Sequence, residues 1–205
     1  MDQEKEKIIK FSRQKFFKEG FYKTTMDELA REMQVSKKTI YKYFPSKEKL
    51  VEEIVDDLIN EIDCSVTDII NTKENVVYKF VRCLNMYNRY LIQLSERWQH
   101  DIQVHTPVIW QKIDTFRTDK IYEGLNRVLE QGKKEKLVED FPNELIITAF
   151  TSTVQSVMNK DFILKSKFSM QQAFAYAFEM LLNGILTKQG LEKYRKMKDN
   201  FELAT

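Results

Sequence analysis

The sequence predicts an all-α protein in which an N-terminal three-helix helix-turn-helix domain is joined by a long helix to a larger helical domain. Three observations support this fold class. Glycine and proline, which interrupt helices, occur only 5 and 3 times in 205 residues. Apolar residues recur every three or four positions along much of the chain, which is the period of a helix with one buried face. Two short helical patterns near the N-terminus are separated by a brief turn, as in a helix-turn-helix.

The first two helices are expected at residues 4–19 and 26–33. Residues 4–19 carry apolar side chains at seven- and eight-residue spacings, and Gly20 directly after them is a common helix end. Thr25 followed three residues later by Glu28 forms a capping box, in which the two side chains satisfy backbone groups at a helix start. The second helix therefore begins at a defined point after a short turn.

A third and a fourth helix follow after turns at Gln34-Val35 and Pro45-Ser46. Ser36 is a suitable N-cap for a third helix that runs to about residue 44. The fourth helix, at 46–71, carries a double apolar row and is expected to pack on both of its neighbours. Further helices are expected near 74–100, 107–114, 116–133, 143–161 and 169–187, followed by a charged, helix-prone segment at 190–205.

The charge distribution separates the N-terminal quarter from the rest of the chain. Residues 1–50 contain 13 Lys and Arg against 8 Asp and Glu, whereas the remainder contains 20 against 23. A basic region on a nearly neutral body indicates an acidic polymer as partner, although a solvated helical face gives the same count. We expect domains at 1–50 and 72–205, with the helix at 46–71 as linker.

Other classes of protein find little support. The chain has two histidines, no glycine-rich phosphate loop and no nucleophile elbow, so no catalytic residues are predicted and an enzyme is disfavoured. Its start does not resemble a signal peptide, and no apolar run reaches membrane-spanning length, so we expect a cytoplasmic protein without a membrane partner. Cys64 and Cys83 form no CxxC pair, which fits a reducing compartment.

The third helix is short, basic and aromatic on its outer side. Ile40, Phe44 and Val35 must dock it on its neighbours, since a helix of this length is not stable alone. Lysines and hydroxyl-bearing side chains then remain outside, where base edges and phosphates can be reached from a DNA groove. The alternative is a solvated, lysine-rich surface.

The run from Ile8 to Leu50 resembles the DNA-binding domain of TetR-type transcriptional regulators. The resemblance covers about a quarter of the chain and is carried by Gly20-Phe21, Thr24-Thr25, Asp27-Glu28-Leu29-Ala30, Val35-Ser36-Lys37, Thr39-Ile40-Tyr41, Tyr43-Phe44 and Ser46-Lys47-Glu48-Lys49-Leu50. Three positions depart from the family pattern: Gln34 replaces the usual turn glycine, Lys38 stands where glycine is frequent, and Met33 stands where alanine is common. The first costs stability if the turn needs a positive φ. The second indicates an unusual operator preference.

The resemblance implies a homodimer that binds near-palindromic double-stranded operator DNA and is released by a small ligand held in the C-terminal domain. By position, base contacts are expected from Lys37, Lys38, Thr39 and Tyr43. Phosphate contacts are expected from Thr24, Thr25, Tyr41, Lys42 and Lys47. No cofactor is implied.

The larger domain offers a candidate dimer surface and candidate ligand residues. Apolar stripes at 143–161 and 169–187 predict a dimer interface, unless both stripes are buried inside one subunit; its members are Phe150, Val154, Ala173, Phe174, Ala177, Phe178 and Leu181. We expect a pocket for an unknown apolar or aromatic ligand, unless the aromatic residues are simply core. Its expected lining is Tyr87, Tyr90, Trp98, His100, Trp110, Tyr122 and Phe150. His100 and His105 are five residues apart and not on one helix face, so no metal site is predicted.

These patterns favour a DNA-binding transcriptional regulator, most of all a ligand-responsive repressor. A ligand-independent DNA-binding or nucleoid-associated protein shares the whole N-terminal evidence and stays open as the alternative. A closed apolar cavity in the larger domain would favour the repressor.

Overall fold

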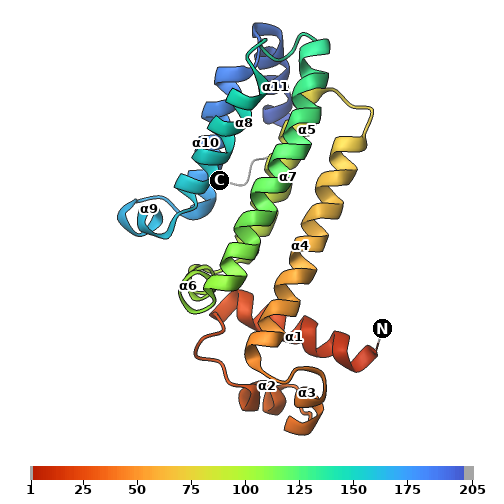
Figure 1. Ribbon diagram of the computed structural model, residues 1–205, viewed down its shortest axis with the longest axis vertical. Helices are drawn as coiled ribbons and strands as arrows, with labels where there is room; N and C mark the ends of the chain where they lie inside the picture. Colours follow the sequence, from red (N-terminus) through yellow and green to blue (C-terminus); the bar gives the residue numbers. More distant parts are fainter. Residues whose placement is uncertain (1, 201–205) are drawn as a thin grey trace. The chain divides into compact units, whose positions relative to one another are not determined.

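The computed structural model describes residues 2–200, without the side chains of residues 117, 121, 160, 164 and 198–200. The described residues form helices, with one isolated antiparallel bridge between Val138 and Leu186, which confirms the all-α fold class (Figure 1). The helices are α1 (Gln3–Glu19), α2 (Met26–Glu32), α3 (Lys37–Tyr43), α4 (Lys47–Asn71), α5 (Val76–Gln93), α6 (Glu96–His105), α7 (Pro107–Lys134), α8 (Asn143–Val157), α9 (Lys160–Lys165), α10 (Met170–Ile185) and α11 (Lys188–Asn200). Among the described residues, none of these helices is long and apolar enough to cross a bilayer.

The chain divides into two compact units. Unit 1 contains residues Met1–Glu61 and Gln93–Ile113, and unit 2 contains Ile62–Ile92 and Asp114–Thr205. Unit 1 therefore combines the helix-turn-helix region with α6, which is distant in sequence. The helices α4 and α7 each contribute residues to both units. The domain ranges expected from the sequence, 1–50 and 72–205, stay a prediction.

The core of unit 1 forms where apolar faces of α1, α2, α3 and the first half of α4 meet. α6 joins this core through Trp98, whose ring lies 4.9 Å from that of Phe17 and 5.5 Å from that of Phe21, centroid to centroid. The Ser95 N–H also donates to the Phe17 carbonyl at 2.8 Å. Burying such side chains away from water is what holds these short helices together. The fully buried side chains are Ile8, Phe16, Leu29, Ile40, Phe44, Leu50, Val51, Ile54 and Val55.

Caps and a strained turn define the helix-turn-helix within unit 1. Thr25 caps α2 by accepting from the Glu28 N–H, and Ser36 caps α3 by accepting from the Thr39 N–H, as predicted. Gln34, between the two helices, has a φ of 56°. Glycine takes this left-handed conformation without cost, so glutamine is strained here by about 1 kcal/mol.

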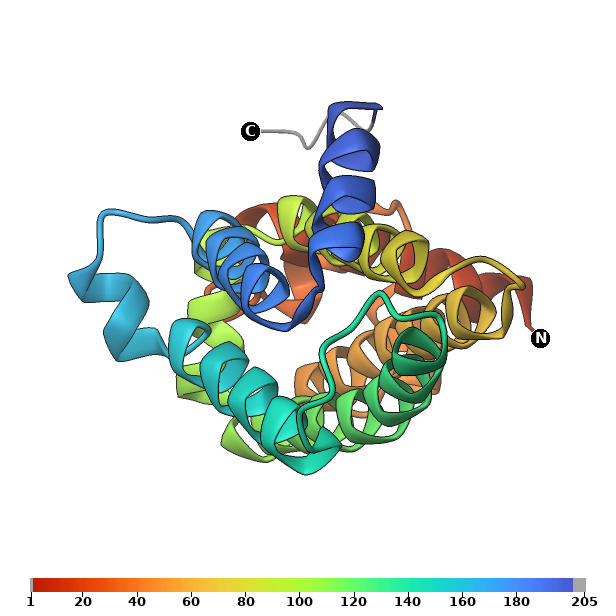
Figure 2. The ribbon, with the colours of Figure 1, turned by 90° about the horizontal axis from the view of Figure 1, so that it is seen from above.

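Unit 2 is built around α5, α7, α8 and α10. α8 and α10 lie side by side, as Figure 2 shows. Their inward stripes and the apolar side of α5 share one hydrophobic core; among its members are Val77, Phe80, Leu84, Leu129, Ile147, Phe150, Val154, Phe174, Phe178 and Leu182.

Three predicted helix boundaries are wrong. The expected helix at 74–100 is broken near residue 95, because the Ser95 hydroxyl accepts from the Trp98 N–H and starts α6. The expected break near residue 115 does not occur, since nothing in the sequence there ends a helix. The expected helix at 143–161 ends at residue 157, and Asn159 then caps the short α9. The helix-prone tail forms α11, and residues 201–205 lie outside the described residues.

Candidate DNA-binding surface and ligand pocket

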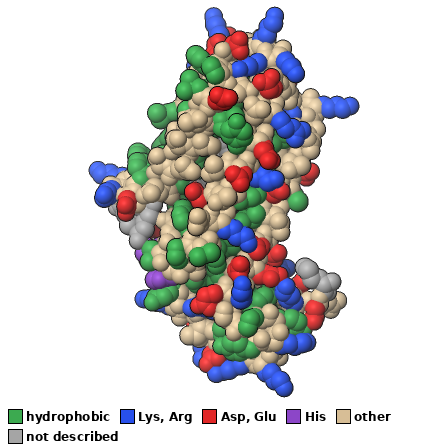
Figure 3. Space-filling view, viewed as in Figure 1, with side chains coloured by type: hydrophobic (Ala, Val, Ile, Leu, Met, Phe, Trp, Pro, Cys, Tyr) green, Lys and Arg blue, Asp and Glu red, His purple; other side chains and the backbone are tan. Residues whose placement is uncertain are grey.

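The outer face of α3 is basic and free of core contacts. Ile40 is fully buried and fixes the helix, whereas Lys37 and Lys38 in its first turn and Tyr41 in its middle are exposed. Figure 3 shows Lys and Arg side chains projecting from the end of unit 1 that carries α2 and α3. An exposed helix with cations at its N-terminal end is what major-groove recognition requires.

Lys37 makes one contact that a DNA partner would have to replace. Its ammonium is paired with the Asp27 carboxylate of α2. Both side chains are more than half exposed, and an exposed pair of this kind contributes no more than about 1 kcal/mol. A DNA base or phosphate can therefore replace the Asp27 carboxylate as the partner of Lys37 with little loss of free energy.

The other end of α3 is joined to the start of α1. The Tyr43 hydroxyl donates to the Asp2 carboxylate, which raises the pKa of Tyr43, and it lies 3.2 Å from the Glu4 carboxylate. Lys42 in turn donates to the Tyr43 hydroxyl at 3.0 Å. Tyr43 and Lys42, both predicted to contact DNA, are thus accessible but already hydrogen-bonded to neighbouring side chains.

Three predicted DNA-contact residues have local structural roles. Thr24 is buried and its hydroxyl lies 3.4 Å from the Gly20 carbonyl, Thr25 is the α2 cap, and the Thr39 hydroxyl lies 2.8 Å from that of Ser36. Such contacts order the region around α3 without themselves reading DNA.

Lys47 is committed to the turn between α1 and α2. Its ammonium donates to the carbonyls of Phe21, Tyr22 and Thr24 at 3.0, 2.7 and 3.0 Å. All three of its N–H donors are used in this way, and burial lowers the pKa of the ammonium. This arrangement leaves no donor for a phosphate, so Lys47 is better described as a residue that holds the turn.

Asp101 of α6 holds the same turn from the opposite side, which the sequence reading missed. Its Oδ2 accepts from the N–H groups of Phe21 and Tyr22 at 2.8 and 2.9 Å, and the side chain is buried. A signal was present in the sequence. Trp98, Asp101 and Ile102 share one face of α6, so a carboxylate interrupts an apolar stripe, and a buried carboxylate needs partners.

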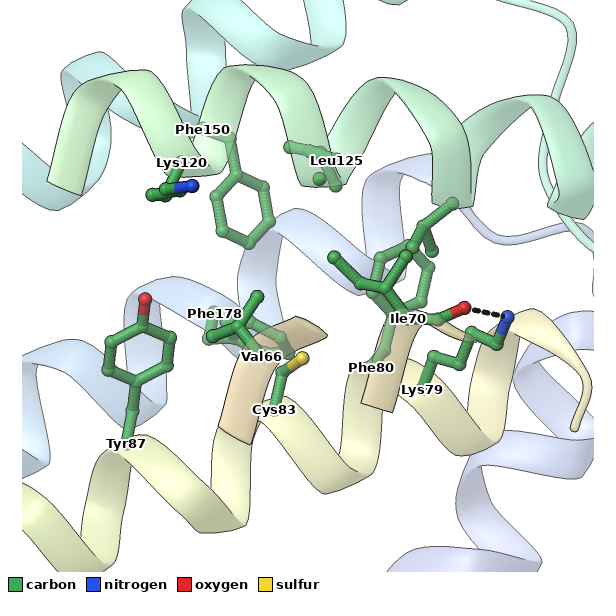
Figure 4. A pocket seen from close by; sticks show the side chains of 12 residues that line it. Val66, Ile70, Lys79, Phe80, Cys83, Tyr87, Lys120, Leu125, Phe150 and Phe178 are labelled. Carbon is green, nitrogen blue, oxygen red and sulfur yellow. Dashed lines mark hydrogen bonds between the residues drawn. The ribbon is translucent and has the colours of Figure 1, made fainter. Parts of the chain in front are cut away.

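Unit 2 contains an apolar pocket among α4, α5, α7, α8 and α10. Its cavity volume is about 80 Å³, smaller than the roughly 300–1,000 Å³ typical of small-molecule sites. In Figure 4, side chains of α5 face Phe150 and Leu125 across the space. The lining residues are Val66, Ile70, Lys79, Phe80, Cys83, Tyr87, Lys120, Gly124, Leu125, Val128, Phe150 and Phe178.

The few polar groups of the pocket are hydrogen-bonded, ion-paired or uncharged. The Lys79 ammonium donates to the Ile70 carbonyl at 2.6 Å and to the Gln131 side-chain oxygen at 2.7 Å, and burial lowers its pKa. Lys120 is paired with Asp63 at 3.1 Å. Burial raises the pKa of the Cys83 thiol to about 12, so it stays protonated. An uncharged, apolar molecule matches such a lining best.

The seven predicted ligand residues are not brought together. Tyr87 and Phe150 line the pocket. Tyr90 lies outside its lining, with its hydroxyl 3.5 Å from that of Ser65, and Tyr122 is more than half exposed. Trp98, His100 and Trp110 belong to unit 1, where Trp98 is core.

Most of the residues predicted for the dimer interface are packed in the core of the subunit. Phe150, Val154, Phe174 and Phe178 belong to the hydrophobic core of unit 2. Ala173, Ala177 and Leu181 line an apolar groove on the surface of α8, α9 and α10, together with Thr153, Val157, Phe162, Phe168, Tyr176 and Met180. Of these, Tyr176 and Met180 are 55% and 75% exposed, so the side chains available to a partner differ from the predicted set.

Comparison with known proteins agrees with this geometry. Residues 8–54 match the family described as bacterial regulatory proteins, tetR family. Over 172 residues the chain is 24% identical to YvaF, an uncharacterised HTH-type transcriptional regulator of Bacillus subtilis (strain 168), covering 83% of this chain and 90% of YvaF.

Two solved structures have a similar fold. A transcriptional regulator of Cytophaga hutchinsonii has a TM-score of 0.72 at 21% identity, covering 91% of this chain and all of that one. SmeT in complex with triclosan has a TM-score of 0.65 at 14% identity, covering 91% and 93%. SmeT is described as the repressor of the Stenotrophomonas maltophilia multidrug efflux pump SmeDEF.

The fold and the exposed α3 define a helix-turn-helix domain of the kind that binds DNA. Residues 8–54, which span this domain, are similar to the bacterial regulatory proteins of the tetR family.

Proposed function

We propose that the protein is a ligand-responsive repressor that binds a near-palindromic operator as a homodimer. The DNA-binding half of this proposal is carried by the exposed first turn of α3. Lys37 and Lys38 stand there without core contacts, on a helix that Ile40 anchors. Side chains in this position of a recognition helix reach base edges, and each specific base contact contributes about 1–3 kcal/mol.

The test is the affinity of Lys37→Ala and Lys38→Ala for operator DNA, measured by fluorescence anisotropy at fixed salt. Each variant should lose about 5- to 150-fold in affinity for the operator, with less change for unrelated DNA, if each lysine makes one base contact. Lys10→Ala, an exposed lysine of α1, is the matched control and should lose far less. Equal losses on operator and unrelated DNA would remove the base-reading role of α3.

The ligand-responsive half is carried by the apolar pocket of unit 2. Its lining of aliphatic and aromatic side chains, with few polar groups, favours an uncharged apolar or aromatic molecule, for which the cavity would have to widen on binding. The triclosan complex of SmeT gives a precedent, because a protein of similar fold binds a small aromatic molecule.

Thermal-shift screening of uncharged apolar compounds supplies a ligand for the second test. The hit is titrated with and without operator. Linkage requires that operator weakens ligand binding by the same factor by which ligand weakens operator binding, commonly about 5- to 150-fold. Cys83→Phe, which fills the pocket, should abolish the response, whereas Cys64→Phe at an exposed position should not. Equal ligand affinity in both titrations would favour ligand-independent DNA binding instead.

Homodimerisation is supported by the surface groove of α8, α9 and α10. Soluble monomers rarely expose contiguous apolar surface of this kind, and a second copy would supply the second half-site contact of a palindromic operator. The exposed Tyr176 and Met180 are the side chains that such a partner would cover.

A further inference from the structure

Both histidines of the chain lie beside the carboxylate that holds the α1–α2 turn. The chain has 2 histidines in 205 residues. Potential ligand atoms of His100, Asp101 and His105 all lie within 4.8 Å of one another. The two imidazole rings have centroids 6.0 Å apart, and Figure 3 shows the histidine side chains at the surface in one place. The five-residue spacing did not predict this cluster, although the structure brings both rings close to each other and to Asp101.

Asp101 is already oriented as a ligand. Its Oδ2 is fixed by the N–H groups of Phe21 and Tyr22, whereas Oδ1 lies 3.7 Å from Nδ1 of His100, beyond hydrogen-bond range. A buried carboxylate whose second oxygen faces an imidazole without bonding to it has room for a cation between the two. The backbone N–H groups on Oδ2 then act as the outer contacts that orient metal ligands in proteins.

The two histidines add imidazole ligands to the Asp101 carboxylate, and they differ in how firmly the ring is held. His105 is stacked on Tyr22, with ring centroids 3.6 Å apart and an interplanar angle of 9°, so its orientation is set by the turn. His100 is exposed, so solvent surrounds part of its side chain and a change of rotamer is not blocked by burial. Tetrahedral ligation by nitrogen and oxygen needs ligand atoms roughly 3.3 Å apart, and rotation of the His100 side chain can supply this contraction.

We propose that His100, Asp101 and His105 bind a divalent transition-metal ion, with Zn²⁺ the best match. Two imidazoles and one carboxylate with an open fourth position for water are a recurrent zinc ligand set. Hard cations such as Mg²⁺ require oxygen ligands, which this cluster does not offer in sufficient number. The bound ion joins α6 to the α1–α2 turn, because Asp101 and His105 both contact that turn.

Zinc binding is measured on tag-free protein in a Cys64→Ser background, which removes the exposed thiol as a competing ligand. Titration with ZnCl₂ against a chromogenic chelator should give one ion per chain. His100→Ala and His105→Ala should each lose at least about tenfold in affinity, as the removal of one ligand from a three-ligand site predicts. Mg²⁺ at the same concentrations should not compete.

Two controls separate the site from surface adsorption. Glu96→Gln removes an exposed carboxylate from the same helix and should leave zinc affinity unchanged. Asp101→Asn keeps an oxygen acceptor for the turn but loses the charge, so it should fold and bind zinc more weakly. Because the chain has only 2 histidines, both ring signals should shift together in a histidine NMR spectrum on addition of one equivalent. Absence of stoichiometric binding, or binding unaffected by loss of either histidine, overturns the proposal.

Discussion

At the residue scale, two opposite charges hold the α1–α2 turn through its backbone. Asp101 accepts from two N–H groups of the turn, and Lys47 donates to three of its carbonyls. Charged groups that are partly removed from water depend on such partners, since loss of one leaves the others unsatisfied. The turn that leads into the helix-turn-helix is therefore ordered by side chains from α4 and α6.

Replacement of Lys47 by Met should lower the free energy of unfolding by about 1–3 kcal/mol, because three carbonyls lose their donor. Lys49→Met is the matched control. Its ammonium is paired with Glu52 at an exposed site, and such pairs contribute no more than about 1 kcal/mol. Urea unfolding followed by circular dichroism measures both. Equal destabilisation by the two substitutions would show that the carbonyl contacts of Lys47 contribute nothing special.

Replacement of Gln34 by Gly should stabilise the protein by about 0.5–1 kcal/mol, because the positive φ of this turn position disfavours a side chain. Gln14→Gly, in the middle of α1, should instead destabilise by about 1 kcal/mol, since glycine is a poor helix former. The free energy of unfolding of each variant is measured by urea titration. A loss of stability in Gln34→Gly would mean that the glutamine side chain makes a contact that outweighs the backbone strain.

The sequence predicted the structural roles of some single residues and not of others. The caps at Thr25 and Ser36 and the strained Gln34 were predicted because each depends on neighbours within a few residues. The role of Asp101 was not, because its partners at Phe21 and Tyr22 are about 80 positions away. Lys47 was assigned to phosphate by family position, and its hydrogen bonds to carbonyls more than 20 positions away were not predicted.

At the element scale, the sequence predicted which segments are helical better than where they end. The long α7 was expected as two helices, and the single helix expected at 74–100 is α5 followed by α6. Serine and asparagine caps such as Ser95 and Asn159 are common outside helix ends, so they indicate a boundary only once tertiary contacts select it. The same holds for apolar stripes. They predict a buried face but not whether the neighbour is the same subunit or another.

The pocket helices α4 and α5 each present a cysteine in a different environment. Cys83 lines the pocket with a pKa of about 12, raised by burial, whereas Cys64 is exposed. Only the thiolate reacts with iodoacetamide, so Cys64 should be alkylated much faster than Cys83 at pH 8. Raising the pH through the pKa should speed the reaction of Cys83. Mass spectrometry of tryptic peptides over time resolves the two rates, and similar rates at pH 8 would contradict the buried pocket lining.

The outer face of α10 should control dimerisation. Met180→Asp and Tyr176→Asp each put a carboxylate into the exposed apolar groove and should yield folded monomers, since burial of an unpaired charge at an interface is unfavourable. Gln172→Asp, also exposed on α10 but outside the groove lining, is the control. Sedimentation equilibrium at micromolar concentration measures the state of each. A wild-type monomer, or a dimer unaffected by both groove substitutions, contradicts this interface.

At the scale of the whole molecule, charge and function divide between the two ends of the chain. The first 50 residues carry the excess of Lys and Arg, and the helix-turn-helix lies within them. Both α4 and α7 contribute residues to unit 1 and to unit 2. The sequence predicted the helix-turn-helix region because its caps and turn depend on residues close together in the chain, whereas the apolar pocket lining carries no comparable signature for its ligand.

Selection of random double-stranded DNA by the wild-type protein tests the central claim most directly. The selected sequences should converge on a near-palindrome whose half-sites are centred about 34 Å apart, one turn of DNA, because two copies of α3 must enter successive major grooves. The double variant Lys37→Ala, Lys38→Ala should enrich no such motif, while Lys10→Ala should enrich the same one. Failure of the wild-type protein to enrich any motif, or the same palindrome from the double variant, would contradict operator recognition by α3.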